Sequence, residues 1–335
     1  MEYRTLGRCG LKVSELGLGA MTFGHSTDQA EARRMVDLAL DAGVNFFDTA
    51  NTYGGSQSEV FLGQALQGRR REAVVATKFF NPTGPGPNDS GMSRLHIMNA
   101  IEDSLQRLQM DYVDVYYIHH VDVQTPLEEM LRALDDLVHQ GKVRYIGCSN
   151  YEAWRLSEAL WISETKNLAR FICYQPQYSL VVRDIEYELL PLCQFKGLGV
   201  VAWSPLAGGF LSGKYQPGQR LLPGTRSEEG WVYPQRYFAT NTDETLQILL
   251  DVSQSLGHSP AQVALRWVLE QPAITAAIVG ARHVDQLRDN LQAAQWRLPD
   301  EARQRLNEVS RPPDRYPQVL ERTMHERRNQ AIRKR

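Results

Sequence analysis

The sequence has little of what marks secreted, membrane-spanning or redox-active proteins. It holds four cysteines in 335 residues, and these lie far apart, without the C-x-x-C pairs of zinc and disulfide-exchange sites. No apolar run is long enough to cross a bilayer, and the first residues lack the basic and apolar regions of a secretory signal. We therefore expect four free thiols, Cys9, Cys148, Cys173 and Cys193, in a cytoplasmic protein.

The sequence also lacks an excess of charge of either sign. Its formal net charge is −2, with acidic and basic residues interspersed. Such a chain creates no long-range field that would attract nucleic acid or an anionic membrane. We expect a small neutral molecule as its partner, with no nucleic-acid or membrane partner, and the sequence predicts no oligomeric state.

Short apolar runs alternate with longer segments of helical period, the pattern of successive βα units around a parallel sheet. Eight such runs are expected to form strands, over residues 16–19, 45–47, 74–77, 113–118, 143–147, 171–174, 200–203 and 277–279. The length also suits one α/β barrel with insertions, because such barrels need roughly 250 residues. The sequence predicts an α/β protein with a single (β/α)8 TIM barrel over residues 1–310 and a C-terminal tail over residues 311–335.

Helix signals fill the gaps between these runs. An apolar stripe over residues 32–40 ends before Gly43, which favours a helix stop. Thr125 and Glu128 form a predicted capping box, with Pro126 at the first helical position. Ser259 and Pro260 repeat this arrangement further along the chain.

Two segments interrupt the pattern, namely residues 81–91 and 217–234, both rich in glycine and proline. Loops that follow barrel strands lie at the catalytic end, so either could cover substrate or cofactor, or serve as a passive connection. The basic tail is expected to be solvated, or partly ordered over the pocket.

Polar side chains follow three neighbouring strand candidates. Asp48 and Lys78 each come directly after an apolar run, Tyr53 lies just beyond Asp48, and His119 and His120 end the fourth run. Because barrel chemistry takes place at the carboxyl ends of the strands, these groups are expected to converge. Strand alternation indicates that only one of the two histidines points inward, without saying which.

This set of groups suits the reduction of a ketone or aldehyde. A phenol is an adequate acid if its pKa falls toward the working pH, and the ammonium of Lys78 favours the phenolate of Tyr53. Asp48 would hold Lys78 charged and oriented. An imidazole beside them can donate a hydrogen bond to the carbonyl oxygen.

The sequence resembles the aldo-keto reductase superfamily over essentially its full length. Residues 46–54, followed by Ser58-Glu59 and Leu62-Gly63, resemble its first signature, and residues 75–78 resemble its lysine strand. Residues 114–119 resemble its histidine strand. The resemblance implies a tetrad of Asp48, Tyr53, Lys78 and His119. His120 takes the place of a more usual tryptophan or arginine, and it is expected either to line the pocket or to face outward.

The resemblance also implies a nicotinamide site. The residues that it assigns to the carboxamide clamp, the ring stack, the pyrophosphate loop and the adenosine site are Ser149, Asn150, Gln175, Trp203, Ser204, Leu206, Gly208, Lys214, Arg226, Gly280, Arg282, Gln286 and Asn290. Arg282 would bind the 2′-phosphate through its guanidinium, which favours NADP(H) over NAD. A Rossmann fingerprint is absent, because Thr22 stands where its third glycine belongs. No metal site is predicted.

Three functions follow from these residues. The first is NADPH-dependent, reversible reduction of an aldehyde or ketone to an alcohol, with Tyr53 as the general acid. The second is a nicotinamide-binding regulatory subunit, because some members of the superfamily serve ion channels. The third is isomerase or aldolase chemistry through a Schiff base on Lys78, which a salt bridge to Asp48 would disfavour because it keeps the amine protonated.

Overall fold

A computed structural model describes residues 1–223 and 241–333, and eight parallel strands form a closed barrel within them. These strands are β3 (Leu16–Gly19), β4 (Phe46–Asp48), β5 (Val74–Phe79), β6 (Val113–Ile118), β7 (Val143–Ser149), β8 (Phe171–Gln175), β9 (Gly199–Ala202) and β10 (Ala276–Val279). β10 pairs with β3 and so closes the ring. The predicted (β/α)8 barrel is confirmed, and no strand bound differs from its predicted position by more than two residues.

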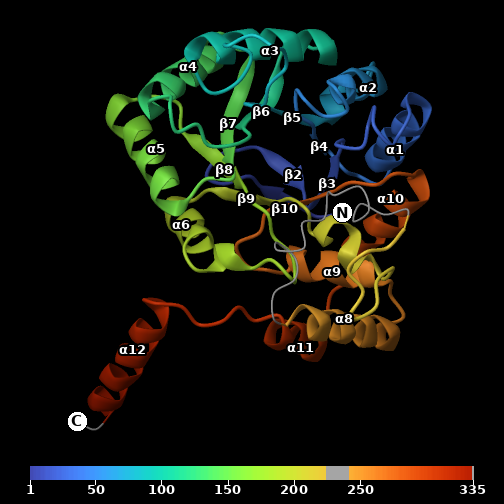
Figure 1. The fold of residues 1–335 in the computed structure, drawn as a ribbon, viewed down its shortest axis with the longest axis vertical. Helices are drawn as coiled ribbons and strands as arrows, with labels where there is room; N and C mark the ends of the chain where they lie inside the picture. Colours follow the sequence, from blue (N-terminus) through green and yellow to red (C-terminus); the bar gives the residue numbers. More distant parts are fainter. Residues whose placement is uncertain (224–240, 334–335) are drawn as a thin grey trace.

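Helices surround the barrel (Figure 1). They are α1 (Gln29–Asp41), α2 (Gln57–Ala65), α3 (Arg94–Leu108), α4 (Leu127–His139), α5 (Ala153–Lys166), α6 (Leu189–Lys196), α8 (Thr242–Leu256), α9 (Pro260–Leu269), α10 (Val284–Leu291) and α11 (Asp300–Val309). A further helix, α12 (Gln318–Arg333), lies apart from the barrel. The apolar stripe of α1 is buried as predicted, and Gly43 follows the helix in a left-handed conformation. We call the end of the barrel where the strands finish the upper end.

The two predicted helix starts differ in outcome. Ser259 caps α9 by accepting the backbone N–H of Gln262, with Pro260 at the first helical position, as predicted. The capping box at Thr125 is wrong, because the Thr125 hydroxyl donates to Asp122 Oδ2 at 2.7 Å and α4 begins without a side-chain cap. Asp122 also accepts the backbone N–H of Gln124, so this carboxylate organises the turn before the helix.

A hairpin that the sequence pattern did not predict lies at the lower end of the barrel. Its strands are β1 (Tyr3–Thr5) and β2 (Lys12–Ser14), which pair antiparallel. Leu6 and Val13 are fully buried and pack with the interior side chains of the barrel, among them Phe46 and Tyr117. Burial of one such aliphatic side chain contributes about 1.5–3 kcal/mol, so the hairpin is a hydrophobic seal for this end.

Beside the hairpin lies a group of charges that we call the lower ion-pair cluster: Arg4, Glu15, Arg266 and Glu270, of which Glu15 and Arg266 are fully buried. Glu15 Oε2 lies 2.8 Å from Arg4 and 3.3 Å from Arg266, and Arg266 lies 3.1 Å from Glu270. Burial lowers the pKa of Arg266, and the carboxylates of Glu15 and Glu270 offset only part of this effect. Each charge in the cluster therefore has an opposite partner.

All four cysteines are free thiols, as predicted. Cys148, Cys173 and Cys193 are buried, whereas Cys9 in the hairpin is half-buried. The Cys173 thiol donates a weak hydrogen bond to Tyr117 Oη at 3.1 Å. Burial raises the pKa of all three buried thiols, that of Cys193 to about 12.

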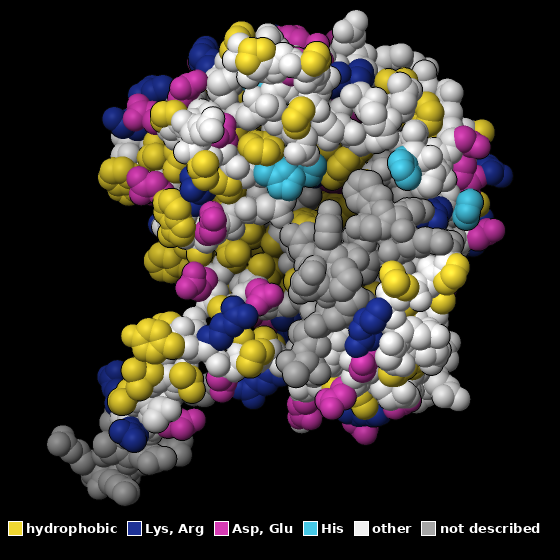
Figure 2. Space-filling view, in the orientation of Figure 1, with side chains coloured by type: hydrophobic (Ala, Val, Ile, Leu, Met, Phe, Trp, Pro, Cys, Tyr) yellow, Lys and Arg dark blue, Asp and Glu magenta, His cyan; other side chains and the backbone are white. Residues whose placement is uncertain are grey.

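The tail leaves the barrel instead of covering it. Arg315 lies 2.9 Å from Asp184 and over the ring of Tyr187, and beyond this anchor α12 projects away (Figure 1). Tyr316, Leu320 and Met324 are exposed, and Figure 2 shows apolar and basic side chains together on this helix. Within the residues that the structure describes, no helix has the length and apolar character needed to span a membrane.

Candidate active site

A buried ion pair forms the base of the site at the upper end of the barrel. Asp48 ends β4 and pairs in register with Ala76 of β5, so Lys78 lies two residues further along the neighbouring strand. The Lys78 ammonium donates to Asp48 Oδ1, and it also donates to the carbonyl oxygen of Thr49 at 2.8 Å. Lys78 and Asp48 are 1% and 3% exposed, which excludes water from competing for the pair.

The second oxygen of Asp48 has a partner from the opposite side of the barrel. Gln175, the last residue of β8, donates its Nε2 to Asp48 Oδ2 at 2.8 Å. Both carboxylate oxygens are therefore occupied, one by Lys78 and one by Gln175. This arrangement leaves the aspartate to orient the lysine, because it has no free oxygen to offer a substrate.

Tyr53 brings its hydroxyl to the same point from the loop after β4. The Lys78 ammonium lies 5.1 Å from the centre of the tyrosine ring, and Tyr53 Oη lies 3.4 Å from His119 Nε2. Gly54 permits this placement, because it has a left-handed backbone and an added Cβ would lie 2.2 Å from the carbonyl oxygen of Phe23. The structure thus brings together all four residues of the predicted tetrad.

The protonation of Tyr53 differs from the sequence-based expectation. Burial raises its pKa, the Lys78 ammonium lowers it, and the balance stands above the ordinary value of a tyrosine. The predicted fall toward the working pH is therefore absent from this structure, because desolvation of the phenolate outweighs the ammonium. At neutral pH the site holds Tyr53 as a phenol, with its proton in place.

Lys78 is held as a cation. Burial lowers its pKa, but the Asp48 carboxylate and Tyr53 together outweigh this effect, and the pKa is raised. A protonated amine is not a nucleophile, so the geometry disfavours a Schiff base at this lysine.

His119 is a neutral imidazole in this environment. Burial lowers its pKa well below the usual range, and the charge of Lys78 and the neighbouring His120 lower it further. Its backbone oxygen accepts Asn150 Nδ2 at 2.9 Å, and its Nδ1 lies 3.4 Å from Asn81 Nδ2. Asn150 and Asn81 thus hold the histidine from two sides.

His120 does not alternate with His119 as the strand pattern predicted. The two imidazole rings stack, with centres 4.6 Å apart and planes 15° apart. Alternation fails because β6 ends at Ile118, so neither histidine is bound to a strand conformation. Histidine side chains are visible on the face of the molecule shown in Figure 2.

Phe80 has an unusual backbone conformation directly after β5. Its φ is 142°, a value that a residue with a Cβ rarely adopts and that costs on the order of 1–3 kcal/mol. The carbonyl oxygen of Phe80 accepts the N–H of Gly91 at 2.8 Å, which closes the predicted loop, and its ring lies 5.5 Å from that of His120. The strained residue thus directs the chain so that Asn81 faces His119.

The predicted carboxamide clamp has a second role in this structure. Ser149 at the end of β7 donates to the carbonyl oxygen of Gln175 at 2.6 Å, which ties two neighbouring strands together. Gln175 contacts Asp48 and Asn150 contacts His119, so these amides brace the tetrad. Their remaining donors and acceptors could serve a carboxamide.

The loop after β9 contains Trp203, Ser204, Leu206, Gly208 and Lys214. Left-handed backbone conformations occur at Ser204, Ala207, Gly208 and Gly209. The N–H groups of Ala207 and Gly208 donate to the carbonyl oxygen and the hydroxyl of Ser204, at 2.9 and 3.1 Å, and that of Gly209 donates to the carbonyl oxygen of Leu206 at 2.9 Å. A Cβ built on Gly209 would meet no described atom within 4 Å. The pyrophosphate role of this loop stays a prediction. Lys214, further along the same loop, has an exposed side chain, and Arg226 lies outside the described residues.

The predicted adenosine site follows β10. Gly280 and Arg282 lie between this strand and α10, and Gln286 Oε1 accepts the backbone N–H of Arg282 at 2.9 Å. Glu31 of α1 accepts the first N–H of α10, from Val284, at 2.6 Å. Asn290 is buried on the same helix. The amides at 286 and 290 thus share a helix, and the first of them also shapes the turn that carries Arg282.

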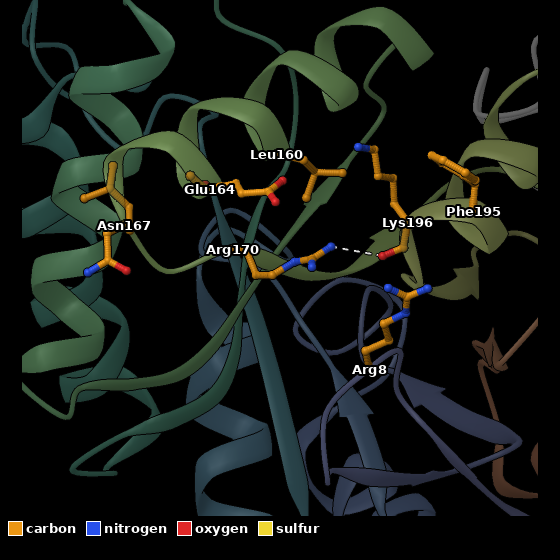
Figure 3. Close-up of a pocket in the computed structure, with 9 residues that line it drawn as sticks. Arg8, Leu160, Glu164, Asn167, Arg170, Phe195 and Lys196 are labelled. Carbon is orange, nitrogen blue, oxygen red and sulfur yellow. Dashed lines mark hydrogen bonds between the residues drawn. The ribbon is translucent and has the colours of Figure 1, made fainter.

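A separate pocket of about 470 Å³ lies at the lower end of the barrel (Figure 3). Arg8, Arg170, Lys196 and Glu164 line it, and Arg170 donates to the carbonyl oxygen of Lys196 at 3.0 Å. Lys196 ends α6, and Arg170 donates to its carbonyl oxygen, at a position where exposed carbonyls favour positive charge. Helix capping accounts for these two cations, and none of the described site candidates lines the pocket.

The aldo/keto reductase family model matches residues 15–311. The chain belongs to this family. Its family membership supports an oxidoreductase, and aldo/keto reductases generally use nicotinamide cofactors. The described residues contain no group of three or more histidine, cysteine, aspartate or glutamate side chains placed to hold a metal ion.

Individual relatives fall into two groups. An uncharacterized oxidoreductase of Bacillus subtilis, YrpG, is 42% identical over 92% of this chain and 96% of its own length. Two probable voltage-gated potassium channel beta subunits, from Oryza sativa and Arabidopsis thaliana, are 40% and 38% identical, each over 88% of this chain and 91% of its own length. This aldo/keto reductase is thus similar to an oxidoreductase and to proteins named as channel subunits.

Two features of this aldo/keto reductase site were missed by the sequence patterns. Asn81 was assigned only to a loop, although its place three residues after Lys78 could have suggested a position beside the histidine. The bond from Gln175 to Asp48 spans the barrel interior, and no sequence signal reports which residues meet across a barrel.

Proposed function

We propose that the protein catalyses the reversible, NADPH-dependent reduction of an aldehyde or ketone to an alcohol. The observation that carries this proposal is the convergence of a protonated phenol, a buried ammonium and a neutral imidazole. Tyr53, Lys78 and His119 come from three different segments, and Tyr53 lies within hydrogen-bond reach of both Lys78 and His119. A carbonyl oxygen placed there can receive a proton and a hydrogen bond together.

The residues of this chain divide the work as follows. A bound nicotinamide cofactor would supply the hydride that reaches the carbonyl carbon. Tyr53 gives its phenol proton to the carbonyl oxygen, so a phenolate remains on Tyr53. The Lys78 ammonium stabilises this phenolate, and Asp48 keeps Lys78 oriented. His119 donates to the carbonyl oxygen and fixes its orientation, and solvent then restores the proton on Tyr53.

The choice of NADP(H) rests on charge at the adenosine end. Arg282 would hold the 2′-phosphate through its guanidinium, Lys214 and Arg226 would meet the pyrophosphate, and Gln286 and Asn290 would contact the adenine. Trp203 would stack against the nicotinamide, with Ser149, Asn150 and Gln175 around its carboxamide. Ser204, Leu206, Gly208 and Gly280 supply the backbone that approaches the phosphates.

The expected substrate class follows from the small net charge of the chain. A small carbonyl compound, without nucleic acid or membrane as a partner, agrees with the net charge of −2. We place this activity in the cytoplasm, where NADPH is available.

The decisive assay follows the loss of NADPH absorbance with a panel of aldehydes and ketones. Tyr53→Phe should lower kcat by about 10²–10⁴-fold, because it removes the proton donor and leaves the ring. Tyr316→Phe, a matched change at an exposed tyrosine, should behave as wild type. If the Tyr53 variant retains full turnover, the assignment of the acid is wrong.

A second candidate, a nicotinamide-binding regulatory subunit, is favoured by the relatives named as channel subunits. It predicts tight NADPH binding without turnover on any carbonyl, together with co-purification of a membrane protein. Single-turnover kinetics with NADPH separates the two candidates, because an enzyme oxidises its bound cofactor when substrate is added.

A further inference from the structure

We propose that Asn81 is a positioning residue, whose side-chain amide selects the tautomer of His119 that carries its proton on Nε2. This inference rests on the proposed carbonyl reduction, and it adds a residue that decides which ring nitrogen of His119 donates a hydrogen bond. It follows from the two nitrogen contacts of His119, from the stacked ring of His120 and from the backbone at Phe80.

The two ring nitrogens of His119 have different neighbours. Nε2 lies 3.4 Å from Tyr53 Oη, and Nδ1 lies 3.4 Å from Asn81 Nδ2. A neutral imidazole has one N–H and one acceptor nitrogen, and an amide nitrogen donates only. With the Asn81 amide donating to Nδ1, the single proton of the ring is on Nε2, which faces Tyr53 and the point where a carbonyl oxygen would lie.

The orientation of the ring is fixed as well as its proton. The imidazole of His120 stacks on His119 at 4.6 Å, and the ring of Phe80 meets His120 edge-on at 5.5 Å. Asn150 holds the backbone oxygen of His119 at 2.9 Å. His119 is thus held at its backbone, at one ring face and at Nδ1, which leaves Nε2 directed at the reacting centre.

The chain adopts a disfavoured conformation to bring Asn81 to this place. Phe80 has a φ of 142°, its carbonyl oxygen is tied to Gly91 at 2.8 Å, and Asn81 follows it directly. Strained backbone persists where the surroundings enforce it, and it gathers at functional sites. Here the strained turn supplies both the ring against His120 and the amide against His119.

The titratable groups that face His119 are Tyr53, Lys78 and His120. Tyr53 contacts Nε2 and Asn81 contacts Nδ1, so among the described residues Asn81 is placed to specify the tautomer. An aspartate at position 81 would reverse the preference, because a carboxylate accepts and would draw the proton onto Nδ1. An enzyme with the wrong histidine tautomer loses up to about 10⁴-fold in kcat.

The test records nitrogen NMR spectra of protein labelled at its histidine rings, without cofactor or substrate. His119 should show a protonated Nε2 and a bare Nδ1 in the wild type, Asn81→Asp should move the proton to Nδ1, and Asn81→Ala should populate both forms. Asn88→Asp makes the same charge change at an exposed site in the same loop and should leave the spectrum unchanged. A wild-type proton on Nδ1, or an unchanged tautomer in both Asn81 variants, would overturn the proposal.

Kinetics provides the second readout. Asn81→Ala should lower kcat about 3–10-fold and Asn81→Asp by at least about 100-fold, with Kd for NADPH unchanged. Because the tautomer is measured without turnover, failure of the proposed reaction and failure of this inference give different results. Absence of carbonyl reduction in the wild type leaves the spectra as an independent test.

Discussion

The two ends of the barrel each contain buried charges, but the charges are partnered in different ways. In the lower ion-pair cluster every arginine and carboxylate faces an opposite charge, and the hairpin of β1 and β2 seals the space beside it. At the upper end Asp48 uses both oxygens to hold Lys78 and Gln175, while Tyr53 and Nε2 of His119 point at each other across 3.4 Å. The charges of the lower cluster thus all pair within the protein, whereas the Tyr53 hydroxyl and Nε2 of His119 can still form hydrogen bonds with a bound molecule.

The largest expected effect comes from breaking the upper pair. Lys78→Met should lower kcat about 10²–10⁴-fold, because the phenolate of Tyr53 loses its ammonium. It should also lower the free energy of unfolding by about 3–5 kcal/mol, because Asp48 is left buried without its cation. The double variant Asp48→Asn, Lys78→Met should regain stability without regaining turnover. Steady-state kinetics and urea unfolding measure the two effects, and full activity in the double variant would contradict this division.

The matching change at the lower end should affect stability alone. Arg266→Met removes one partner of Glu15 and Glu270 and should cost about 3–5 kcal/mol of the free energy of unfolding. Turnover per folded molecule should equal that of the wild type, since the lower cluster contacts none of the upper residues. Adding Glu15→Gln should recover part of the loss. A reduced kcat in fully folded Arg266→Met would show that the two ends are coupled.

A smaller effect is expected at the adenosine side of the upper end. Arg282→Ala should raise Kd for NADPH about 10–100-fold, because it removes charge-assisted bonds to the 2′-phosphate, and should leave NADH binding unchanged. Arg288→Ala is the matched control, since Arg288 is exposed on α10 and pairs with Asp285. Fluorescence titration gives both constants. An equal loss for the two cofactors would assign Arg282 to another role.

The smallest effect concerns stability below neutral pH. The native pKa of His119 is well below its unfolded value of about 6.5. Below about pH 6.5 this histidine therefore binds a proton in the unfolded chain but stays neutral in the native protein. The free energy of unfolding therefore falls as the pH drops below about 6.5, by at most about 1.4 kcal/mol per pH unit from this group. His119→Gln should reduce this slope, whereas His139→Gln at an exposed site should not. Identical slopes in all three proteins would contradict a buried neutral His119.

The barrel and the convergence of polar groups at one of its ends were predictable from local signals, whereas the choice of His119 came from the family resemblance. Apolar runs mark the strands, and polar residues such as Asp48 and Lys78 directly follow or end these runs, so barrel geometry alone places them at one end. The hairpin was missed because strands of three residues, such as β1, carry too short a pattern. The protonation of Tyr53 could not be predicted either, since it depends on how deeply the phenol is buried, which the packing decides.

The stacking of His119 on His120 shows a different limit. Alternation applies only within a strand, and the sequence does not report that β6 ends at Ile118. Likewise, the contact from Asn81 to His119 depends on the unusual φ of Phe80, which side-chain pattern does not indicate. Features that depend on a backbone departing from its regular form are therefore the ones that sequence reasoning misses.

The distribution of the four thiols determines how the molecule can be labelled. Three are buried with raised pKa values, so the thiolate that reacts with maleimides or iodoacetamide hardly forms at Cys148, Cys173 or Cys193. Cys9 is half-buried in the hairpin, at the end of the barrel away from Tyr53. A single dye or surface linker attached there would report on the folded protein, or immobilise it, with the upper end still open to solution.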